Sequence, residues 1–109
     1  MIALVFAYET DDGAPFEEVY GANGSWAGFF REAPGFVGTE LLQDVEQAGR
    51  YLVVDRWESR DAYNRFVEQH REEYMRRVDE TAFLYRQELR LGTFENLWAE
   101  ERAGHPTAP

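Results

Sequence analysis

The sequence of 109 residues lacks two reactive side chains, since it contains neither cysteine nor lysine. Without cysteine the chain forms no disulfide bond, no thiolate metal site and no thiol nucleophile. All eleven basic residues are arginine, so a Schiff-base mechanism and a lysine general base are excluded as well. Both absences narrow the chemistry that the chain could carry out.

Positive charge is also scarce, because 21 acidic residues against 11 basic ones give a formal net charge of −10. Binding to a nucleic acid backbone needs clustered positive charge, so we expect no nucleic acid partner. The N-terminal stretch 1–8 has no basic lead and is followed by Glu9, Asp11 and Asp12, unlike a signal peptide. We therefore expect a cytoplasmic protein without a membrane partner.

Recognisable cofactor motifs are missing too. The sequence has no Gly-x-Gly-x-x-Gly motif and no Walker A motif, so nucleotide cofactors are not expected. Imidazole could come only from His70 and His105, and the single carboxylate of Glu73 one turn from His70 falls short of a metal site. We expect no metal and no other cofactor.

Apolar residues, by contrast, make up 44% of the sequence and aromatic residues 16%, as in a folded domain. The length suits one domain, which we place at 1–98, followed by a flexible, proline-containing tail at 99–109 that includes His105. A domain of this size buries only about two-thirds of the surface that its unfolded chain exposes, so assembly into a homodimer would add to stability.

The hydrophobic pattern predicts an alternation of strands and helices. The predicted elements are a strand at 2–8, buried on both faces in the centre of a sheet, two short helices or one kinked helix at 16–33, antiparallel strands at 36–44 and 50–58, a main helix at 59–85 and a last strand at 88–95. Gly21 and Gly24 interrupt the first helical stretch, and Ser25 and Ser59 are the predicted N-caps.

This order of elements is that of a ferredoxin-like split βαβ sandwich, an α+β fold with both helices on one face of the sheet. The other face is then uncovered, although the first strand is apolar on both sides. A second protomer's sheet would cover it and close a dimeric α+β barrel. We therefore predict a homodimer.

A candidate pocket lies where the strand at 50–58 meets the following helix. Trp57 ends the strand, and Tyr63 and Phe66 come on the first turns of the helix, so the three rings would form an apolar wall for a flat organic ligand. Tyr74 follows on the same helical stripe and is a further predicted contact. Packing of the core would use the same residues, and that alternative is open.

Polar groups on this helix suggest a catalytic role. Tyr63, His70 and Arg77 are spaced seven residues apart, so all three would lie near one face. A phenol, an imidazole and a guanidinium there could bind a phenolic or quinonoid substrate and stabilise its deprotonated form. Alternatively, His70 is a packing residue and Arg77 pairs with Glu73 or Glu80.

Asp55 shares a strand face with Trp57, and an inward carboxylate would need a partner or a raised pKa. We include Asp55 among the expected substrate contacts and as a second candidate for the base. Its alternative role is an ion pair with an arginine.

The chain resembles the antibiotic biosynthesis monooxygenase family of dimeric α+β barrels in three segments, which are residues 26–42, residues 51–59 together with Tyr63 and Phe66, and residues 88–94. The resemblance implies the same fold. It also implies catalysis without metal or flavin, as in members that oxidise polyketide anthrones or quinols. In those members the substrate anion itself passes an electron to dioxygen inside a dry pocket.

The resemblance implies residue roles as well. Trp57 and Tyr63 would orient the substrate rings, and Arg77 would support the substrate oxyanion. Val53 stands where such enzymes carry an asparagine, which is a departure from their pattern.

The haem-degrading branch of the superfamily matches less well. It relies on an asparagine on the first strand, a tryptophan on the second helix and a histidine ligand about three turns later. Here the first strand has no asparagine, Phe66 occupies the tryptophan position, and the ligand position falls near Arg76. We expect no haem ligation by that scheme.

The sequence therefore predicts a cofactor-independent monooxygenase that oxidises a small aromatic, phenolic or quinol-type metabolite with dioxygen. His70, or alternatively Asp55, would remove a proton, Arg77 would stabilise the oxyanion, and the aromatic residues would exclude water. The alternatives are a non-catalytic dimer that binds a small ligand and a polyketide cyclase or isomerase.

Overall fold

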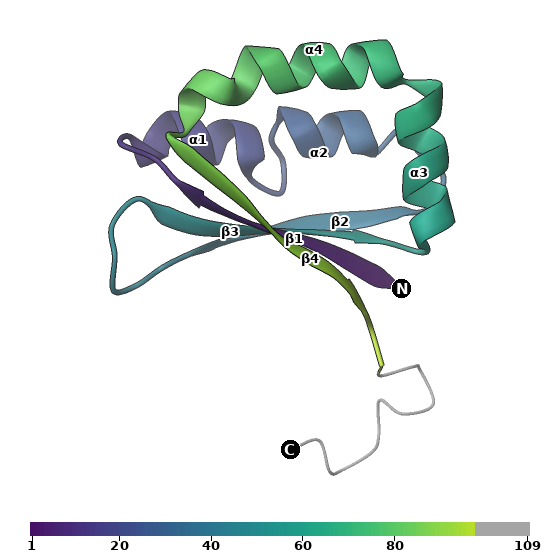
Figure 1. Ribbon diagram of the computed structural model, residues 1–109, viewed down its shortest axis with the longest axis horizontal. Helices are drawn as coiled ribbons and strands as arrows, with labels where there is room; N and C mark the ends of the chain where they lie inside the picture. The colour runs from purple at the N-terminus through teal and green to yellow at the C-terminus, as the bar shows by residue number, and fades with distance from the viewer. Residues whose placement is uncertain (98–109) are drawn as a thin grey trace.

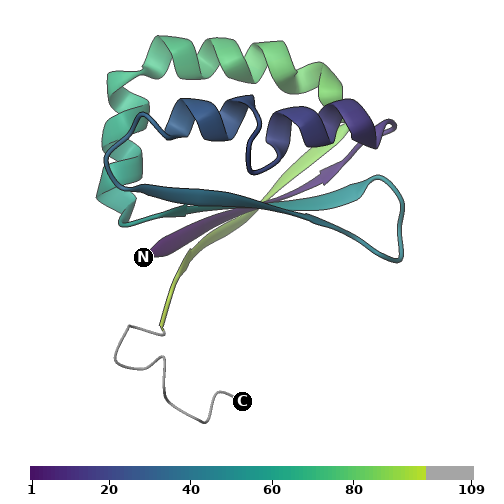
Figure 2. The ribbon, with the colours of Figure 1, turned by 180° about the vertical axis from the view of Figure 1, so that it is seen from behind.

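The computed structural model describes residues 1–97 and contains a four-stranded antiparallel sheet beneath a layer of helices (Figure 1). All described helices lie on one side of the sheet, and the view from behind shows no described element on the other side (Figure 2). The predicted tail at 99–109, with His105, lies outside the described residues.

The elements follow the predicted order. The first helical region forms two short helices, which is one of the two predicted outcomes, whereas the predicted main helix at 59–85 is divided in two. The elements are β1 (Ile2–Glu9), α1 (Gly13–Tyr20), α2 (Ser25–Phe30), β2 (Phe36–Gln43), β3 (Arg50–Trp57), α3 (Arg60–Gln69), α4 (Arg71–Thr81), a 3-10 turn η1 (Ala82–Leu84) and β4 (Gln87–Glu95). The strand order is β2-β3-β1-β4, and all neighbours are antiparallel. This arrangement confirms the predicted ferredoxin-like α+β fold.

The strand β1 lies between β3 and β4, which confirms its predicted central position. Leu4 and Tyr8 are buried beneath the helices, whereas Val5 and Ala7 on the outer face are only half-buried. The prediction that both faces of β1 are buried is therefore wrong for a single protomer, because no described element covers the outer face.

The first helical region forms two helices because the chain turns sharply between them. A Cβ atom at Gly24 would overlap the carbonyl oxygens of Glu18 and Val19, so the turn requires glycine at this close approach. Gly24 is also the N-cap of α2 and makes no side-chain hydrogen bond. The predicted Ser25 cap is wrong, since Ser25 is already the first residue of the helix.

The predicted main helix is interrupted at His70. Ser59 caps α3 as predicted, because the backbone N–H of Ala62 donates to Ser59 Oγ at 3.0 Å. His70 has φ −120° and ψ 33°, outside the helical region, and α4 leaves at a sharp angle to α3 (Figure 1). The predicted alignment of Tyr63, His70 and Arg77 on one helix face is therefore wrong.

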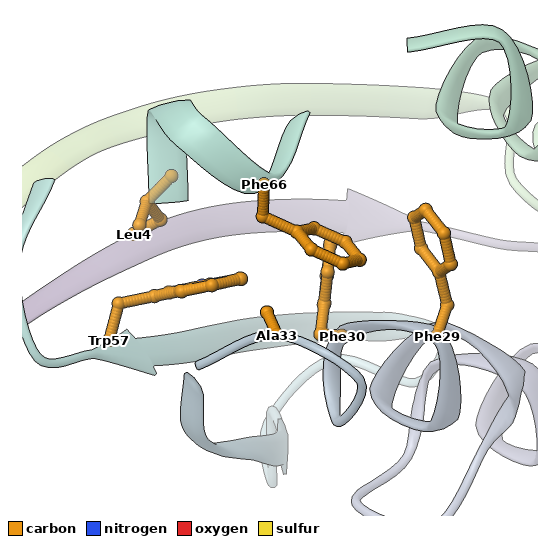
Figure 3. Packing of buried hydrophobic residues seen from close by; sticks show 6 residues of the cluster. All are labelled: Leu4, Phe29, Phe30, Ala33, Trp57 and Phe66. Carbon is orange, nitrogen blue, oxygen red and sulfur yellow. The ribbon is translucent and has the colours of Figure 1, made fainter. Parts of the chain in front are cut away.

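The core beneath α2 and α3 is built around Trp57, whose exposed fraction is 0%. The rings of Phe30 and Phe36 meet the indole edge-on, with centroids 5.4 and 5.2 Å away. Phe66 packs on the indole from α3, and Figure 3 shows Phe30 and Phe66 beside Trp57. A second cluster, which contains the fully buried Phe16, fixes α1 to the other end of the sheet. These contacts hold α1, α2 and α3 close to the strands.

The edge strand β4 contains a bulge that sets which side chains face the helices. Its register against β1 shifts between Val5 and Phe6, where Gly92 adopts a φ of 149° that favours glycine. Before the bulge, Glu88 and Arg90 point to the helical side of the sheet. The side chains of these two exposed residues thereby line the cavity described below.

Candidate functional site

The helix α4 stands off from the sheet, with a cavity of about 510 Å³ beneath it. No residue of α4 is buried, and both ribbon views place α4 farther from the sheet than α1 and α2 (Figures 1 and 2). Met75 and Val78 of α4 face the cavity from above, and Leu4 and Phe6 of β1 face it from the sheet. A cavity of this size is typical of sites for organic ligands of several rings.

Phenol groups dominate the polar lining of the cavity. Five of the six tyrosines face it: Tyr8, Tyr20, Tyr63, Tyr74 and Tyr85. Burial raises the pKa of Tyr20 to about 12. It also raises the pKa of Tyr8, Tyr63 and Tyr85 above the ordinary phenol value. These four phenols therefore stay protonated at neutral pH and can donate hydrogen bonds.

Asp55 supplies a carboxylate at one end of the cavity. It lies on β3, opposite Leu4 of β1 and Thr39 of β2. Burial raises the pKa of Asp55 from its ordinary 3.8 to about 6, although a hydrogen bond from Thr39 Oγ1 to Asp55 Oδ1, at 2.6 Å, opposes the rise. The predicted ion pair with an arginine is not found among residues 1–97, and Thr39 is the partner instead.

Arg90 brings positive charge to the same end of the cavity. Its Nη2 donates to Thr93 Oγ1 at 2.7 Å. Thr93 on β4 and Asp55 on β3 are paired with the same residue of the central strand, Leu4, so this hydrogen bond directs the Arg90 side chain toward the row that contains Asp55. Burial is the main cause of the raised pKa of Tyr63, and the nearby charge of Arg90 acts against it. Asp55, Tyr63 and Arg90 thus form one polar group, which we call the Asp55 end.

Glu88 supplies a carboxylate at the opposite end, where it faces Tyr8 across the β1 and β4 strands. The Tyr8 hydroxyl donates to Glu88 Oε2 at 2.6 Å, and the Tyr85 hydroxyl donates to Glu88 Oε1 at 3.4 Å. The rings of Tyr85 and Tyr20 lie 5.0 and 5.1 Å from the ring of Tyr8. We call this carboxylate with its three phenols the Glu88 end.

Three of the predicted site residues line the cavity, namely Asp55, Tyr63 and Tyr74. Trp57 and Phe66 belong to the core instead, with exposed fractions of 0% and 3%. The ring of Trp57 nevertheless contacts that of Tyr63 edge-on, with centroids 5.3 Å apart. Trp57 and Phe66 therefore do not form the predicted wall that faces a ligand. Trp57 packs instead against the side of Tyr63, which does line the cavity.

His70 and Arg77 lie outside the cavity lining. The ring of His70 stacks on that of Phe66 at 4.3 Å, and its Nδ1 lies 3.1 Å from the Phe66 carbonyl oxygen, as a packing residue would. Arg77 pairs with Glu73 at 2.9 Å, and its guanidinium lies 4.6 Å from the centre of the Phe29 ring. The prediction that both converge on the cavity is wrong, because the helix changes direction at His70.

Sequence reasoning missed Tyr8, Glu88 and Arg90, which supply most of the remaining polar chemistry. The alternation in 88–95 places Glu88 and Arg90 on one face of the last strand. That signal was present, but it does not say which face of the strand meets the helices.

Among residues 1–97, no group of three or more His, Asp or Glu side chains is arranged to hold a metal ion. Within the same range, every helix is too short or too polar to cross a bilayer.

Comparison with known proteins gives one family match. A model of the family described as antibiotic biosynthesis monooxygenase matches residues 1–81. No curated protein matches the chain.

Several solved structures have a similar fold. The structure of SnoaB, a cofactor-independent oxygenase from Streptomyces nogalater, has a TM-score of 0.71 and 23% identity, covering 91% of this chain and 95% of that one. A protein of Deinococcus radiodurans named for the same family has a TM-score of 0.70 and 15% identity, with the same coverage. A MhuD variant with two manganese protoporphyrin IX molecules per active site has a TM-score of 0.62 and 24% identity, covering 91% and 97%.

Proposed function

Because the chain belongs to the antibiotic biosynthesis monooxygenase family, we propose that it is a cofactor-independent monooxygenase acting on a small aromatic, phenolic or quinol-type metabolite. The observation that carries the proposal is Asp55, a carboxylate with a pKa of about 6 that faces a cavity lined by phenols. A base with a pKa near the working pH is suited to taking a proton from an acidic carbon or a phenol.

Asp55, rather than His70, is the proposed base. Its Oδ1 accepts the hydrogen bond from Thr39, whereas Oδ2 has no hydrogen-bond donor among residues 1–97. In the ionised form, Oδ2 can therefore accept a proton from a substrate bound in the cavity. The hydrogen bond from Thr39 holds the carboxyl group in one orientation while this happens.

Arg90 and Tyr63 are the proposed supports for the negative charge that then forms on the substrate oxygen. Both face the cavity at the Asp55 end, and Tyr63 is a protonated donor at neutral pH. Fixed donors at a developing oxyanion stabilise it strongly in a site of low dielectric constant. This assignment replaces the predicted role of Arg77, which is bound to Glu73.

Oxygenation proceeds from the substrate anion. The anion passes one electron to dioxygen, and the two radicals combine at the deprotonated carbon as a peroxide anion. This anion takes back the proton held by Asp55, and the resulting hydroperoxide loses water to leave a carbonyl group. One methylene group and one dioxygen thus give one carbonyl and one water, so no external reductant is required. The description of SnoaB as a cofactor-independent oxygenase supports this route.

The residues of this chain do not fit the haem-degrading scheme. Phe66 lies in the core with an exposed fraction of 3%, and Arg76, near the expected ligand position, pairs with Glu73 and Glu80 at 3.7 and 4.0 Å. These residues offer no haem ligand of the kind that the haem-degrading scheme requires.

Oxygen consumption with a panel of anthrones and quinols tests the proposed function. We expect turnover by the purified protein without added flavin, haem or metal, with one carbonyl product formed for each dioxygen consumed. Turnover should be unchanged by a chelator. Conversion without oxygen would instead identify a cyclase or isomerase, and binding of the panel without conversion would identify a non-catalytic binding protein.

Two arginine variants serve as matched controls for this experiment. Arg90→Gln removes the positive charge at the Asp55 end and is expected to lower kcat about 10²-fold. Arg77→Gln leaves the lining of the cavity intact and is expected to change kcat less than about twofold. The opposite order of effects would contradict the assignment of the oxyanion support to Arg90.

We also propose that the protein is a homodimer formed through the outer face of the sheet. That face carries the apolar side chains of Leu42, Leu89 and Phe94, which are 43%, 52% and 53% exposed in the protomer. The half-buried Val5 and Ala7 of β1 lie in the middle of the same face. A contiguous apolar face of this kind marks an interface, and a second copy would complete the predicted dimeric α+β barrel.

Leu89→Glu tests the dimer, because it places a charge on the outer face without disturbing a buried residue. We expect sedimentation to show a dimer for the wild-type protein and a monomer for Leu89→Glu at micromolar concentration. The control is Phe83→Glu at the 82% exposed Phe83 of η1, on the helical side, which should remain dimeric. A monomeric wild-type protein would contradict the proposal.

A further inference from the structure

We infer that the Glu88 end is a second recognition site, which binds a hydroxyl or amino group at the end of the substrate farthest from the reacting carbon. The inference rests on the proposed function only for what happens at the Asp55 end. The recognition itself is a binding property of Glu88 and the phenols of Tyr8, Tyr20 and Tyr85, and it can be measured without turnover.

The position of Glu88 is unusual for a surface carboxylate. Although it is an exposed residue of the edge strand, its side chain turns to the helical face, where it lines the cavity and meets Tyr8. No arginine among residues 1–97 forms an ion pair with it. The neighbouring Arg86 pairs with Glu9 and Asp11 outside the cavity.

The hydrogen bonds at this end leave acceptor capacity unused. A carboxylate offers about four acceptor positions, and the two phenol hydroxyls use two of them. Because a carboxylate only accepts hydrogen bonds, the remaining positions suit a further donor and not another acceptor. A ligand hydroxyl or amino group satisfies this need, whereas a ligand carbonyl does not.

The surrounding rings define the shape of the group that is bound. Tyr85 meets Tyr8 edge-on at 5.0 Å, and Tyr20 lies 6.5 Å from Tyr85. The Tyr20 hydroxyl donates to Thr81 Oγ1 at 3.1 Å, which fixes its ring at the edge of the cavity. A flat ring that carries the donor can therefore lie against phenol faces while its substituent reaches Glu88.

The two carboxylates are too far apart for one small ring to touch both. Asp55 lies opposite Leu4, and Glu88 lies opposite Tyr8, four residues further along β1. Strand geometry puts them about 13 Å apart along the strands and about 10 Å apart across them, or roughly 16 Å between Cα atoms. A single phenol would reach only one end, so the inferred substrate is elongated and has a donor at its far end.

Binding of three anthraquinones, which lack the methylene group that the proposed reaction oxidises, tests this inference. The ligands are 9,10-anthraquinone, 2-hydroxyanthraquinone and 2-aminoanthraquinone, titrated by fluorescence quenching in the absence of substrate. We expect the hydroxyl and amino compounds to bind the wild-type protein about tenfold more tightly than the unsubstituted one. A hydroxyl preference alone or an amino preference alone would still support the site and would identify the donor that it selects.

Variants assign the preference to one end of the cavity. Glu88→Met is expected to abolish the tenfold difference, whereas Asp55→Asn, which removes the proposed base, should retain it. If Glu88→Met does not fold, Glu88→Gln replaces it and is expected to reduce the difference, because a neutral amide is a weaker acceptor. Glu95→Met on the same strand, outside the cavity lining, is the control and should behave as the wild-type protein.

Three outcomes would overturn the inference: equal affinities for the three ligands, no binding of any of them, or a full preference that survives in the Glu88 variant. Failure of the proposed function gives a different result, since a protein without oxygenase activity would still show the binding preference and its loss on substitution of Glu88.

Discussion

Replacing Asp55 with asparagine is expected to lower kcat for oxygenation by about 10²–10⁴-fold while leaving the protein folded. Asparagine has nearly the same shape and can still accept the hydrogen bond from Thr39, which Asp55 accepts at 2.6 Å. It cannot accept a proton from the substrate. The measurement is oxygen consumption under saturating substrate, and a rate near that of the wild-type protein would exclude Asp55 as the base.

The pH dependence of the wild-type rate gives a second readout of the same residue. Since the pKa of Asp55 is raised to about 6, the rate should fall as the pH is lowered through about 6 and should be nearly constant above pH 7. Thr39→Val is the matched variant, because it removes the hydrogen bond that lowers this pKa. Its rate profile should shift to higher pH, which a purely structural role of Thr39 would not cause.

The stability of Asp55→Asn should differ from that of the wild-type protein in a direction set by the same pKa. The native pKa of about 6 lies above the ordinary 3.8, so between these pH values the native state binds more protons than the unfolded state. The free energy of unfolding of the wild-type protein therefore falls as the pH rises through this window. At pH 8, urea unfolding should show Asp55→Asn to be more stable by on the order of 2 kcal/mol, and at pH 4 the difference should vanish.

The fold could be predicted because the alternation of apolar residues along the sequence shows where each strand lies. In 50–57, Tyr51, Val53 and Trp57 alternate with the residues of the other face, and the structure buries all three on the helical side. The two apolar faces of β1 likewise predicted its central position. These patterns depend only on the two-residue period of a strand, which is visible in the sequence alone.

The break at His70 could not be predicted in the same way. The apolar stripe continues from α3 into α4, and neither glycine nor proline lies near the junction to mark it. The change of direction accompanies tertiary packing, in which the His70 ring stacks on Phe66 and meets Phe29 edge-on. The prediction that His70 and Arg77 lie beside Tyr63 is therefore wrong, because the seven-residue spacing aligns these side chains only on one continuous helix.

Predicting the charged groups of the site requires knowing which face of each strand meets the helices, and the sequence does not show this for every strand. Asp55 was placed on the correct face because Trp57, two residues later, is too large and apolar to point outward. Glu88 and Arg90 have no such neighbour, since Leu89 and Leu91 alternate with them and suggest the opposite face. In a single protomer these leucines are exposed, as the proposed homodimer through the outer face of the sheet would require.

Replacing Trp57 with alanine is expected to lower the free energy of unfolding by about 3–5 kcal/mol. The side chain is 0% exposed, and its ring contacts that of Phe36 as well as those of Phe30 and Phe66, which Figure 3 shows beside it. Truncation would leave a large cavity in this rigid packing. Guanidinium unfolding measures the loss, and Tyr63→Phe is the control, which should cost less than about 1 kcal/mol because the ring is kept.

Trp57→Phe separates a core role from a ligand role for the indole. The Nε1–H of Trp57 is buried and has no acceptor among the described residues, so phenylalanine removes a donor that the protein already leaves unpaired. We therefore expect Trp57→Phe to be less destabilising than Trp57→Ala and to bind quinones with an unchanged affinity. If the affinity fell at least tenfold while stability was kept, the indole would be donating to the ligand. The cavity would then have to extend to Trp57, which in the unliganded protein stands behind Tyr63.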